Sequence, residues 1–185
     1  IAGCVDDIAV VRSMQADLPI HSTGVLFLHT GWNTAGRPSL GSWVNYGLGS
    51  ETENLPGFVV LSFGVVPCGG LENYSNGFLP GSFQATQFNA EGVPLQNVQS
   101  VDSLLSTQRA KLDALSALNS RFSASLGGHD AVESAIKNYE LAYHMQSEVP
   151  DVLDLGHETE ATLRLYGIDS AVDSQRLYGI QCLRA

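Results

Sequence analysis

Basic side chains are scarce in this chain of 185 residues, which has nine Lys and Arg against nineteen Asp and Glu. Before residue 100 the only ones are Arg12 and Arg37. Nucleic-acid binding depends on clustered Lys and Arg, and a net charge of −10 repels phosphate backbones. The composition therefore argues against nucleic acid as a partner.

Long apolar runs are missing as well. No run approaches the roughly 20 residues that a membrane-spanning helix needs, and no basic, apolar leader is present. The three cysteines, Cys4, Cys68 and Cys182, are widely spaced and form no C-x-x-C or Cys/His zinc pattern. Buried free thiols, or one disulfide with a leftover thiol, are the two interpretations that remain. At 44% hydrophobic and 15% charged, the chain has a globular composition.

The first third of the chain has the pattern of an α/β fold. Apolar runs at 8–13 and 58–63 predict buried strands, with 8–11 and 58–61 as parallel neighbours in one sheet. Between them, residues 23–30 predict one helix, and Ser39 begins a second. This order of elements is typical of a doubly wound α/β sheet.

The rest of the chain changes character twice. Residues 64–100 have little periodicity, yet their phenylalanines predict a folded loop held by aromatic side chains. From 101 the pattern is helical. We divide the chain into a partial α/β core (1–63), an irregular region rich in glycine and aromatic residues (64–100), and a helical cap region (101–185).

Two long helices are expected within residues 101–149. Ser103 can cap the first, and the glycines at 127–128 end it; Asp130 begins the second, which runs to the residue before Pro150. The short break predicts that the two helices pack antiparallel. Shorter helices are expected at about 158–166 and from about 171.

Several separate blocks of this sequence resemble one bacterial family. The blocks are GRPSLGSWVNYGLGSE at 36–51, NGFLPGSFQ at 76–84 and YELAYHMQ at 139–146. The family they resemble is called domain of unknown function 1501 and is described as sulfatase-like, within the alkaline phosphatase superfamily. The resemblance covers almost the whole chain.

That resemblance implies an alkaline-phosphatase-like, doubly wound sheet with a C-terminal helical insertion or cap. It implies a hydrolase of sulfate or phosphate esters, acting on a small-molecule or glycan ester in the periplasm or outside the cell. It also implies a divalent metal ion, whose ligands would lie mostly outside this chain. Family members are longer, so we expect a central fragment that is inactive alone. The alternative is a non-catalytic secreted binding or assembly protein that keeps the fold.

The segment His21-Ser22-Thr23 is the sharpest candidate for catalysis. It precedes an apolar helix, whose free N–H groups and dipole favour an anion. By resemblance to sulfatases, His21 falls where the nucleophile would sit, and it could act as a metal ligand, as an acid or base, or as a covalent nucleophile. Ser22 or Thr23 could be a displaced nucleophile. The simpler interpretation is that one of them only caps the helix.

Other candidates have structural alternatives. Arg12 would stand at the carboxyl end of the first strand, where it could hold an oxyanion or pair with a nearby Asp. Arg37 could meet an anion at the second helix, although the glycines there favour close packing. We expect His29 to be a core histidine. We expect the acidic cluster after His157 to be solvated, because it lacks the H-E-x-x-H spacing.

Overall fold

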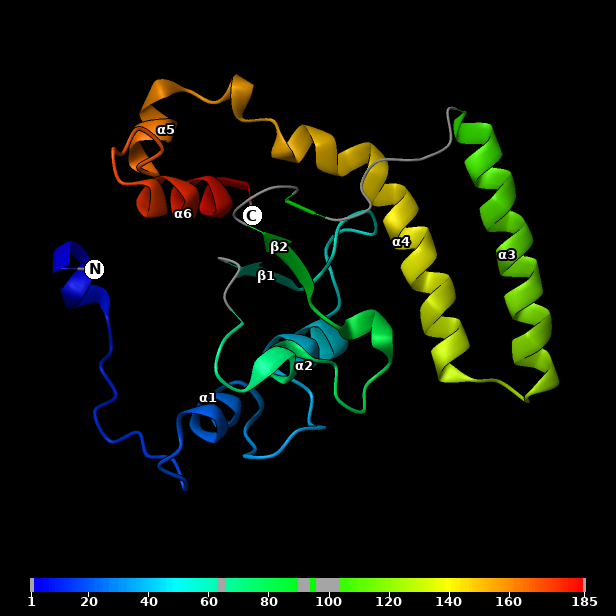
Figure 1. Ribbon diagram of the computed structural model, residues 1–185, viewed down its shortest axis with the longest axis horizontal. Coiled ribbons are helices and arrows are strands. Elements are labelled where there is room, and N and C mark those ends of the chain that lie inside the picture. The colour runs from blue at the N-terminus through cyan, green and yellow to red at the C-terminus, as the bar shows by residue number, and fades with distance from the viewer. Residues whose placement is uncertain (1, 63–65, 90–93, 96–103, 185) are drawn as a thin grey trace.

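The computed structural model describes residues 2–62, 66–89, 94–95 and 104–184 (Figure 1). Within them lie six α-helices and a two-stranded parallel sheet, so the α/β class is confirmed. The helices are α1 (His21–Thr30), α2 (Leu40–Leu48), α3 (Leu105–Ser125), α4 (Asp130–Leu153), α5 (Glu160–Leu165) and α6 (Asp173–Arg184). The strands are β1 (Val59–Ser62) and β2 (Thr86–Asn89), and four short 3-10 helices are η1 (Ala2–Asp7), η2 (Gly70–Tyr74), η3 (Gly81–Phe83) and η4 (Leu155–His157).

The sheet pairs different strands from those predicted. The strand expected at 8–13 is wrong, because these residues are irregular and exposed, and Val10 is 70% exposed. The neighbour of β1 is β2, with Val59 opposite Thr86. An apolar run has the composition of a buried strand, but it becomes one only with a hydrogen-bonded neighbour. The sequence hid β2, since Phe88 is its single apolar residue.

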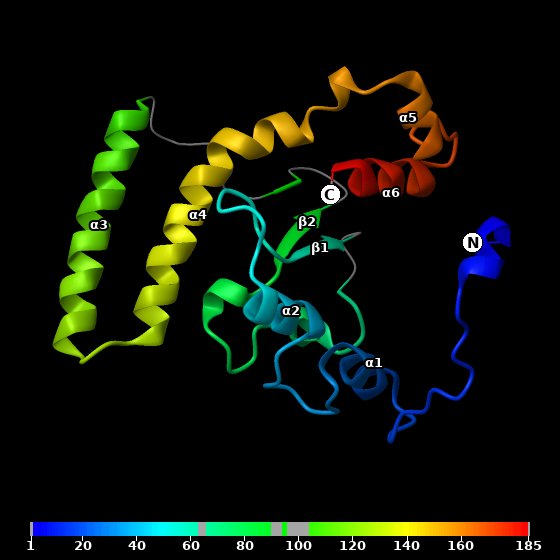
Figure 2. The ribbon, with the colours of Figure 1, turned by 180° about the vertical axis from the view of Figure 1, so that it is seen from behind.

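The hydrophobic core lies between this sheet and α4. Its buried members are Phe88, Leu95, Met145 and Val149. Val59 and Leu61 of β1 pack against them, because alternate residues of a strand point to the same face. Helices α1 and α2 lie on the other side of the strands, as the rear view also shows (Figure 2).

One buried side chain joins α6 to the sheet. Gln181 is 3% exposed, and its Nε2 donates to the carbonyl of Ser62 at 2.8 Å and to that of Phe88 at 3.0 Å. These carbonyls belong to the carboxyl ends of β1 and β2. A single amide therefore bridges both strands and fixes the end of α6 against them.

The described part of the 64–100 region is folded, as expected. Leu79 and Phe88 are buried. The ring of Phe78 meets Trp43 at 5.7 Å between centroids, and the ring of Phe83 meets Tyr46 at 5.2 Å, both edge to face. Such pairs add to the burial of apolar area. The aromatic residues thus hold this segment against α2.

The three cysteines are free thiols, so no disulfide forms between them. Their predicted burial is wrong, since Cys4 and Cys68 are exposed and Cys182 is half-buried. No helix in the described part of the chain has the length and apolar character needed to cross a membrane.

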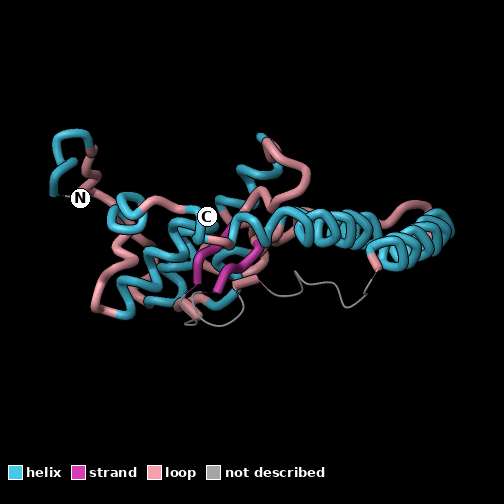
Figure 3. Tube along the Cα trace, turned by 90° about the horizontal axis from the view of Figure 1, so that it is seen from above, coloured by secondary structure: helices cyan, strands magenta, loops and turns pink. Residues whose placement is uncertain are grey.

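Helices α3 and α4 form the antiparallel pair that the sequence predicts, and the pair projects to one side of the molecule (Figure 3). The proposed cap Ser103 lies outside the described residues. Helix α4 continues past the expected stop and ends at Leu153, with Pro150 inside it. Proline removes one hydrogen bond from the helix. The last turn of α4 is nevertheless held in place by the packing of Val149, which is 1% exposed.

A charged cluster clamps the hairpin. The Arg109 guanidinium donates two hydrogen bonds of 2.7 Å to the Glu140 carboxylate and lies 5.2 Å from the centre of the Tyr143 ring. Asp113 accepts a third hydrogen bond from it at 2.8 Å. Hydrogen bonding from Arg109, aided by its charge, holds the pKa of Glu140 below its ordinary value of 4.5. Bidentate hydrogen bonds between Arg and a carboxylate are among the stronger surface interactions.

We expect Arg109→Met to destabilise the hairpin at neutral pH and to have little effect in strong acid. A carboxyl whose folded pKa is lowered stabilises the fold above its unfolded pKa, and that contribution disappears as the pH falls through the folded pKa. The measurement is the urea midpoint at both pH values. Arg164→Met is the control, because its pair with Glu160 is exposed on α5. An equal loss at both pH values would contradict the assignment.

Candidate functional site

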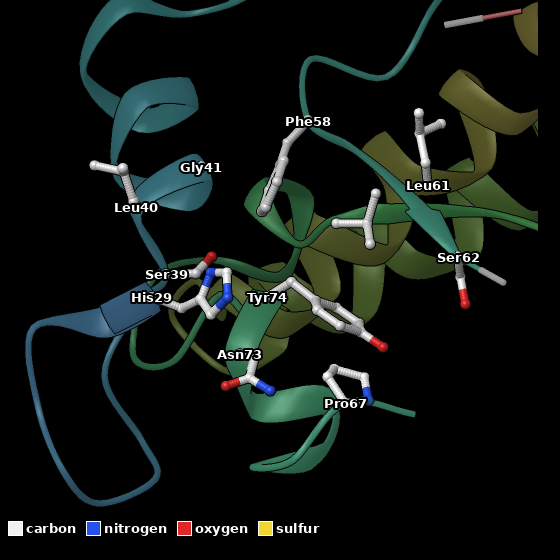
Figure 4. A pocket seen from close by; sticks show the side chains of 11 residues that line it. His29, Ser39, Leu40, Gly41, Phe58, Leu61, Ser62, Pro67, Asn73 and Tyr74 are labelled. Atoms are coloured by element: carbon white, nitrogen blue, oxygen red, sulfur yellow. The ribbon is translucent and has the colours of Figure 1, made fainter. Parts of the chain in front are cut away.

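A pocket of about 470 Å³ opens along β1, on the side that faces α1, α2 and η2 (Figure 4). Phe58, Val60 and Ser62 line it. Val59 points to the core instead, while Leu61 contributes both to the core and to the pocket rim. One short strand therefore carries the hydrophobic core on one face and the wall of a candidate site on the other.

The opposite wall comes from helix ends. His29 belongs to the last turn of α1, Ser39 and Leu40 to the start of α2, and Tyr74 to the end of η2. Figure 4 shows the rings of Phe58, His29 and Tyr74 around the space between these elements. Ligand pockets are commonly apolar with a few polar groups that orient the ligand, and this lining has that character.

The pocket wall requires glycine at position 41. The ring of Phe58 packs directly on the α2 backbone there, and a Cβ on Gly41 would lie 2.3 Å from the Phe58 ring. Any larger residue would push the ring away from its place. The packing of the Phe58 ring on α2 therefore depends on the absence of a side chain at position 41.

A buried serine pair fixes the start of α2. Ser39 caps the helix, and its hydroxyl lies 3.0 Å from that of Ser42. The Ser42 hydroxyl donates to the carbonyl of Ser75 at 3.0 Å, and the Ser39 backbone N–H donates to the same oxygen at 3.0 Å. Both serines are fully buried, at 2% and 0% exposure. This favours the packing interpretation of the glycine-rich segment over an anion cradle.

The neighbouring backbones meet at Gly77. Its φ is +53°, and a Cβ there would lie 2.4 Å from the backbone carbon of Arg37. The Arg37 guanidinium sits 4.9 Å from the centre of the Trp32 ring. Arg37 is thus engaged in a cation–π contact.

Asn73 shapes the floor of the pocket. It is 1% exposed, and its Nδ2 donates to the carbonyls of Cys68 and Gly70 at 2.8 and 2.9 Å. Its Oδ1 has no hydrogen-bond partner among the described residues. The side-chain amide therefore holds the turn that leads into η2.

The structure does not bring the predicted site residues into this pocket. His21 is the first residue of α1 and is exposed, eight positions before the pocket-lining His29 along the helix. Eight residues span about 12 Å of helix. Arg12 and Ser13 follow no strand, so the sheet edge expected to position them is absent from the described residues.

Ser22 and Thr23 do not cap α1. The N-cap is Ile20, which has no side-chain cap, and the Thr23 hydroxyl donates back to the Ile20 carbonyl at 3.0 Å. The capping interpretation is therefore wrong. No side chain caps the backbone N–H groups of the first turn.

Sequence reasoning missed His29 as a site residue. It was expected in the core, but it is exposed at the pocket. The expectation failed because it assumed that all of the apolar helix faces inward; of its residues only Leu26 is buried. The run from Phe58 to Leu61 is apolar throughout, so the sequence carried no alternation that could have identified the other wall.

Acidic residues near η4 do not assemble a metal centre. His157 lies 3.7 Å from Asp154 and is 93% exposed at its side chain. Within the described ranges, no group of three or more His, Cys, Asp or Glu side chains is placed to hold a metal ion. The family resemblance places the ligands of its implied metal mostly outside this chain, and the described residues supply no complete set by themselves.

We expect Gly77→Ala to destabilise the protein far more than Gly127→Ala. Both glycines have positive φ, which costs about 1–2 kcal/mol for alanine. Only at Gly77 does the added Cβ also meet backbone atoms. The free energy of unfolding of the Gly77→Ala variant should therefore fall by at least about 3 kcal/mol. Gly127 has open space around it and is the matched control. Urea unfolding of both variants measures the difference, and equal losses would mean that the 37–77 contact is not close.

Comparison with known proteins gives a family and no named relative. No curated protein matches the chain, and no solved structure matches it either. One family model matches residues 1–185, which is the whole chain. The chain therefore belongs to the family described as protein of unknown function (DUF1501).

Proposed function

We propose that this chain is part of a hydrolase of sulfate or phosphate esters, and that the pocket beside β1 receives the organic group of the ester. The observation that supports it is the mainly apolar pocket with an exposed histidine at its edge. An apolar wall suits an aryl or alkyl group. Imidazole is the side chain best suited to exchanging a proton near neutral pH.

The chemistry proposed for His29 is proton donation to the leaving oxygen of the ester. Ester hydrolysis adds water across the S–O or P–O bond and leaves an alcohol or phenol, whose oxygen must gain a proton. The hydroxyls of Ser62 and Tyr74 line the same pocket and could hydrogen-bond the organic group. The substrate class we propose is thus a small-molecule or glycan ester with an apolar face.

The finer family implications belong to the same proposal. The parallel pair β1–β2, covered on both faces, suits a fragment of a doubly wound, alkaline-phosphatase-like sheet with α3–α6 as its cap. A divalent metal would be held by residues mostly outside this chain, in a periplasmic or secreted protein. The negative net charge of this chain repels anionic esters, so positive charge must come from the metal or from other segments.

We expect the full-length protein to hydrolyse phenyl sulfate or phenyl phosphate, whose poor leaving group needs a proton, and His29→Gln to lower kcat about 100-fold or more, as loss of a general acid does. His157→Gln is the control, since this exposed histidine lies outside the pocket. Released phenol measures turnover. Saturable binding of either ester without turnover, with each of several divalent ions, would instead support the non-catalytic binding protein.

His21→Ala tests the other end of α1 in the same assay. If His21, with Ser22, Thr23 and Arg12, holds the reacting group, turnover should fall much more than the melting temperature, because an exposed histidine contributes little packing. Since the two histidines lie about 12 Å apart along the helix, a small ester cannot engage both as reacting groups. An unchanged rate would show that His21 is only the first residue of a helix.

A further inference from the structure

A second pocket, of about 390 Å³, opens at the amino ends of the two strands. Pro56 and Gly57, just before β1, line it together with Thr86, the first residue of β2. Helices α2 and α4 and the short helix η3 complete its wall. Among the described residues it shares no lining residue with the pocket beside β1. Its volume is within the range of about 300–1000 Å³ that small-molecule sites have.

The polar side chains of this pocket are uncharged. They are the amides of Asn45, Gln84 and Asn138 and the hydroxyls of Ser82 and Thr86. None of the five makes a side-chain hydrogen bond to another described residue. Their donors and acceptors are therefore available to a ligand. We call this site, with these five side chains, the amide pocket.

Helical spacing explains how α4 contributes to the amide pocket. Leu141, Ala142 and Met145 follow Asn138 by three, four and seven positions, which places all four on one face of the helix. Met145 belongs to the hydrophobic core, as does Leu95, which also lines the pocket, whereas Asn138 is exposed. The pocket therefore combines an apolar floor with polar side chains around it.

Gly57 leaves room for the amide of Asn45. A Cβ at position 57 would lie 2.4 Å from the Oδ1 atom of Asn45. The φ of Gly57 lies outside the left-handed region, so alanine can adopt the same backbone. An alanine at this position would therefore displace the amide of Asn45, which ends a flexible side chain, rather than strain the backbone.

We propose that the amide pocket binds a neutral sugar of one ring. No Asp, Glu, Lys, Arg or His is among the described residues that line it, so a charged group entering it would lose hydration without gaining a counter-charge. A sugar hydroxyl both donates and accepts hydrogen bonds, and a side-chain amide presents donors and an acceptor side by side. Leu95, Leu141 and Met145 suit the C–H face of a sugar ring.

A ligand with several hydroxyls fits this lining better than a peptide group does. A peptide group has one donor and one acceptor, which would leave most of the five polar side chains without a partner. A sugar carries hydroxyls all around its ring and can engage side chains from several elements at once. The inference does not rest on the proposed hydrolase, because sugar binding needs no turnover and this site is separate from the pocket that His29 lines.

A ligand-observed NMR titration of the full-length protein with D-glucose, D-galactose and D-mannose tests the proposal. We expect saturable binding of at least one of them, with a Kd on the order of 1 mM, as for a small polar ligand. Asn138→Leu should weaken that binding about tenfold, because it removes hydrogen bonds to the ligand. Asn138 is exposed, so the fold should be unchanged, which circular dichroism checks. Gly57→Ala should also weaken the binding, by displacing the amide of Asn45.

Asn119→Leu is the matched control, because it makes the same change on α3, outside the pocket, and should leave binding unchanged. The anionic sugar D-glucuronate should bind at least about tenfold more weakly than the best of the neutral sugars. Absence of saturable binding by all three neutral sugars overturns the proposal. Binding that neither pocket variant weakens overturns it too, as does equal binding of glucuronate, because neither result would come from an uncharged pocket lined by amides.

Discussion

The carbonyl oxygen of Ser75 is the point on which the pocket depends. It accepts hydrogen bonds from the Ser39 backbone and from the Ser42 hydroxyl, and it thereby joins the start of α2 to the loop after η2. Gly77 lets the two backbones come this close. If the contact were lost, the helix start and η2 would separate, and the wall opposite β1 would lose its position.

Strand β1 relates this pocket to the rest of the protein. Its alternate residues serve the core beneath α4 and the pocket beneath α1 and α2. A change in core packing would therefore shift the pocket wall as well, since a strand moves as a unit. The site and the stability of the chain are coupled through four residues of backbone.

The sequence predicted elements whose signal is local. The Ser39 cap and the break at Gly127 are each decided within a few residues, and α2 and the α3–α4 hairpin formed as expected. Strand pairing is not local. Residues 8–13 have the apolar composition of a strand but no paired neighbour, whereas β2 is mostly polar and yet pairs with β1. His29 was misjudged for the same reason, because its exposure depends on which elements cover α1. The residues of β1 that face the pocket were not readable beforehand, because the run is apolar from Phe58 to Leu61 without alternation.

The hydrogen bond from Gln181 to Ser62 joins residues 119 positions apart, and this separation has a kinetic consequence. Contacts between distant parts of a chain form late, because the entropy cost of closing a long loop comes before the contact can stabilise the fold. During synthesis, both strands leave the ribosome well before α6 does. Until α6 has been synthesised, the carbonyls at the carboxyl ends of β1 and β2 lack their Gln181 donor and are exposed to water or to other chains. Chaperone binding to the nascent chain would be most useful in that interval.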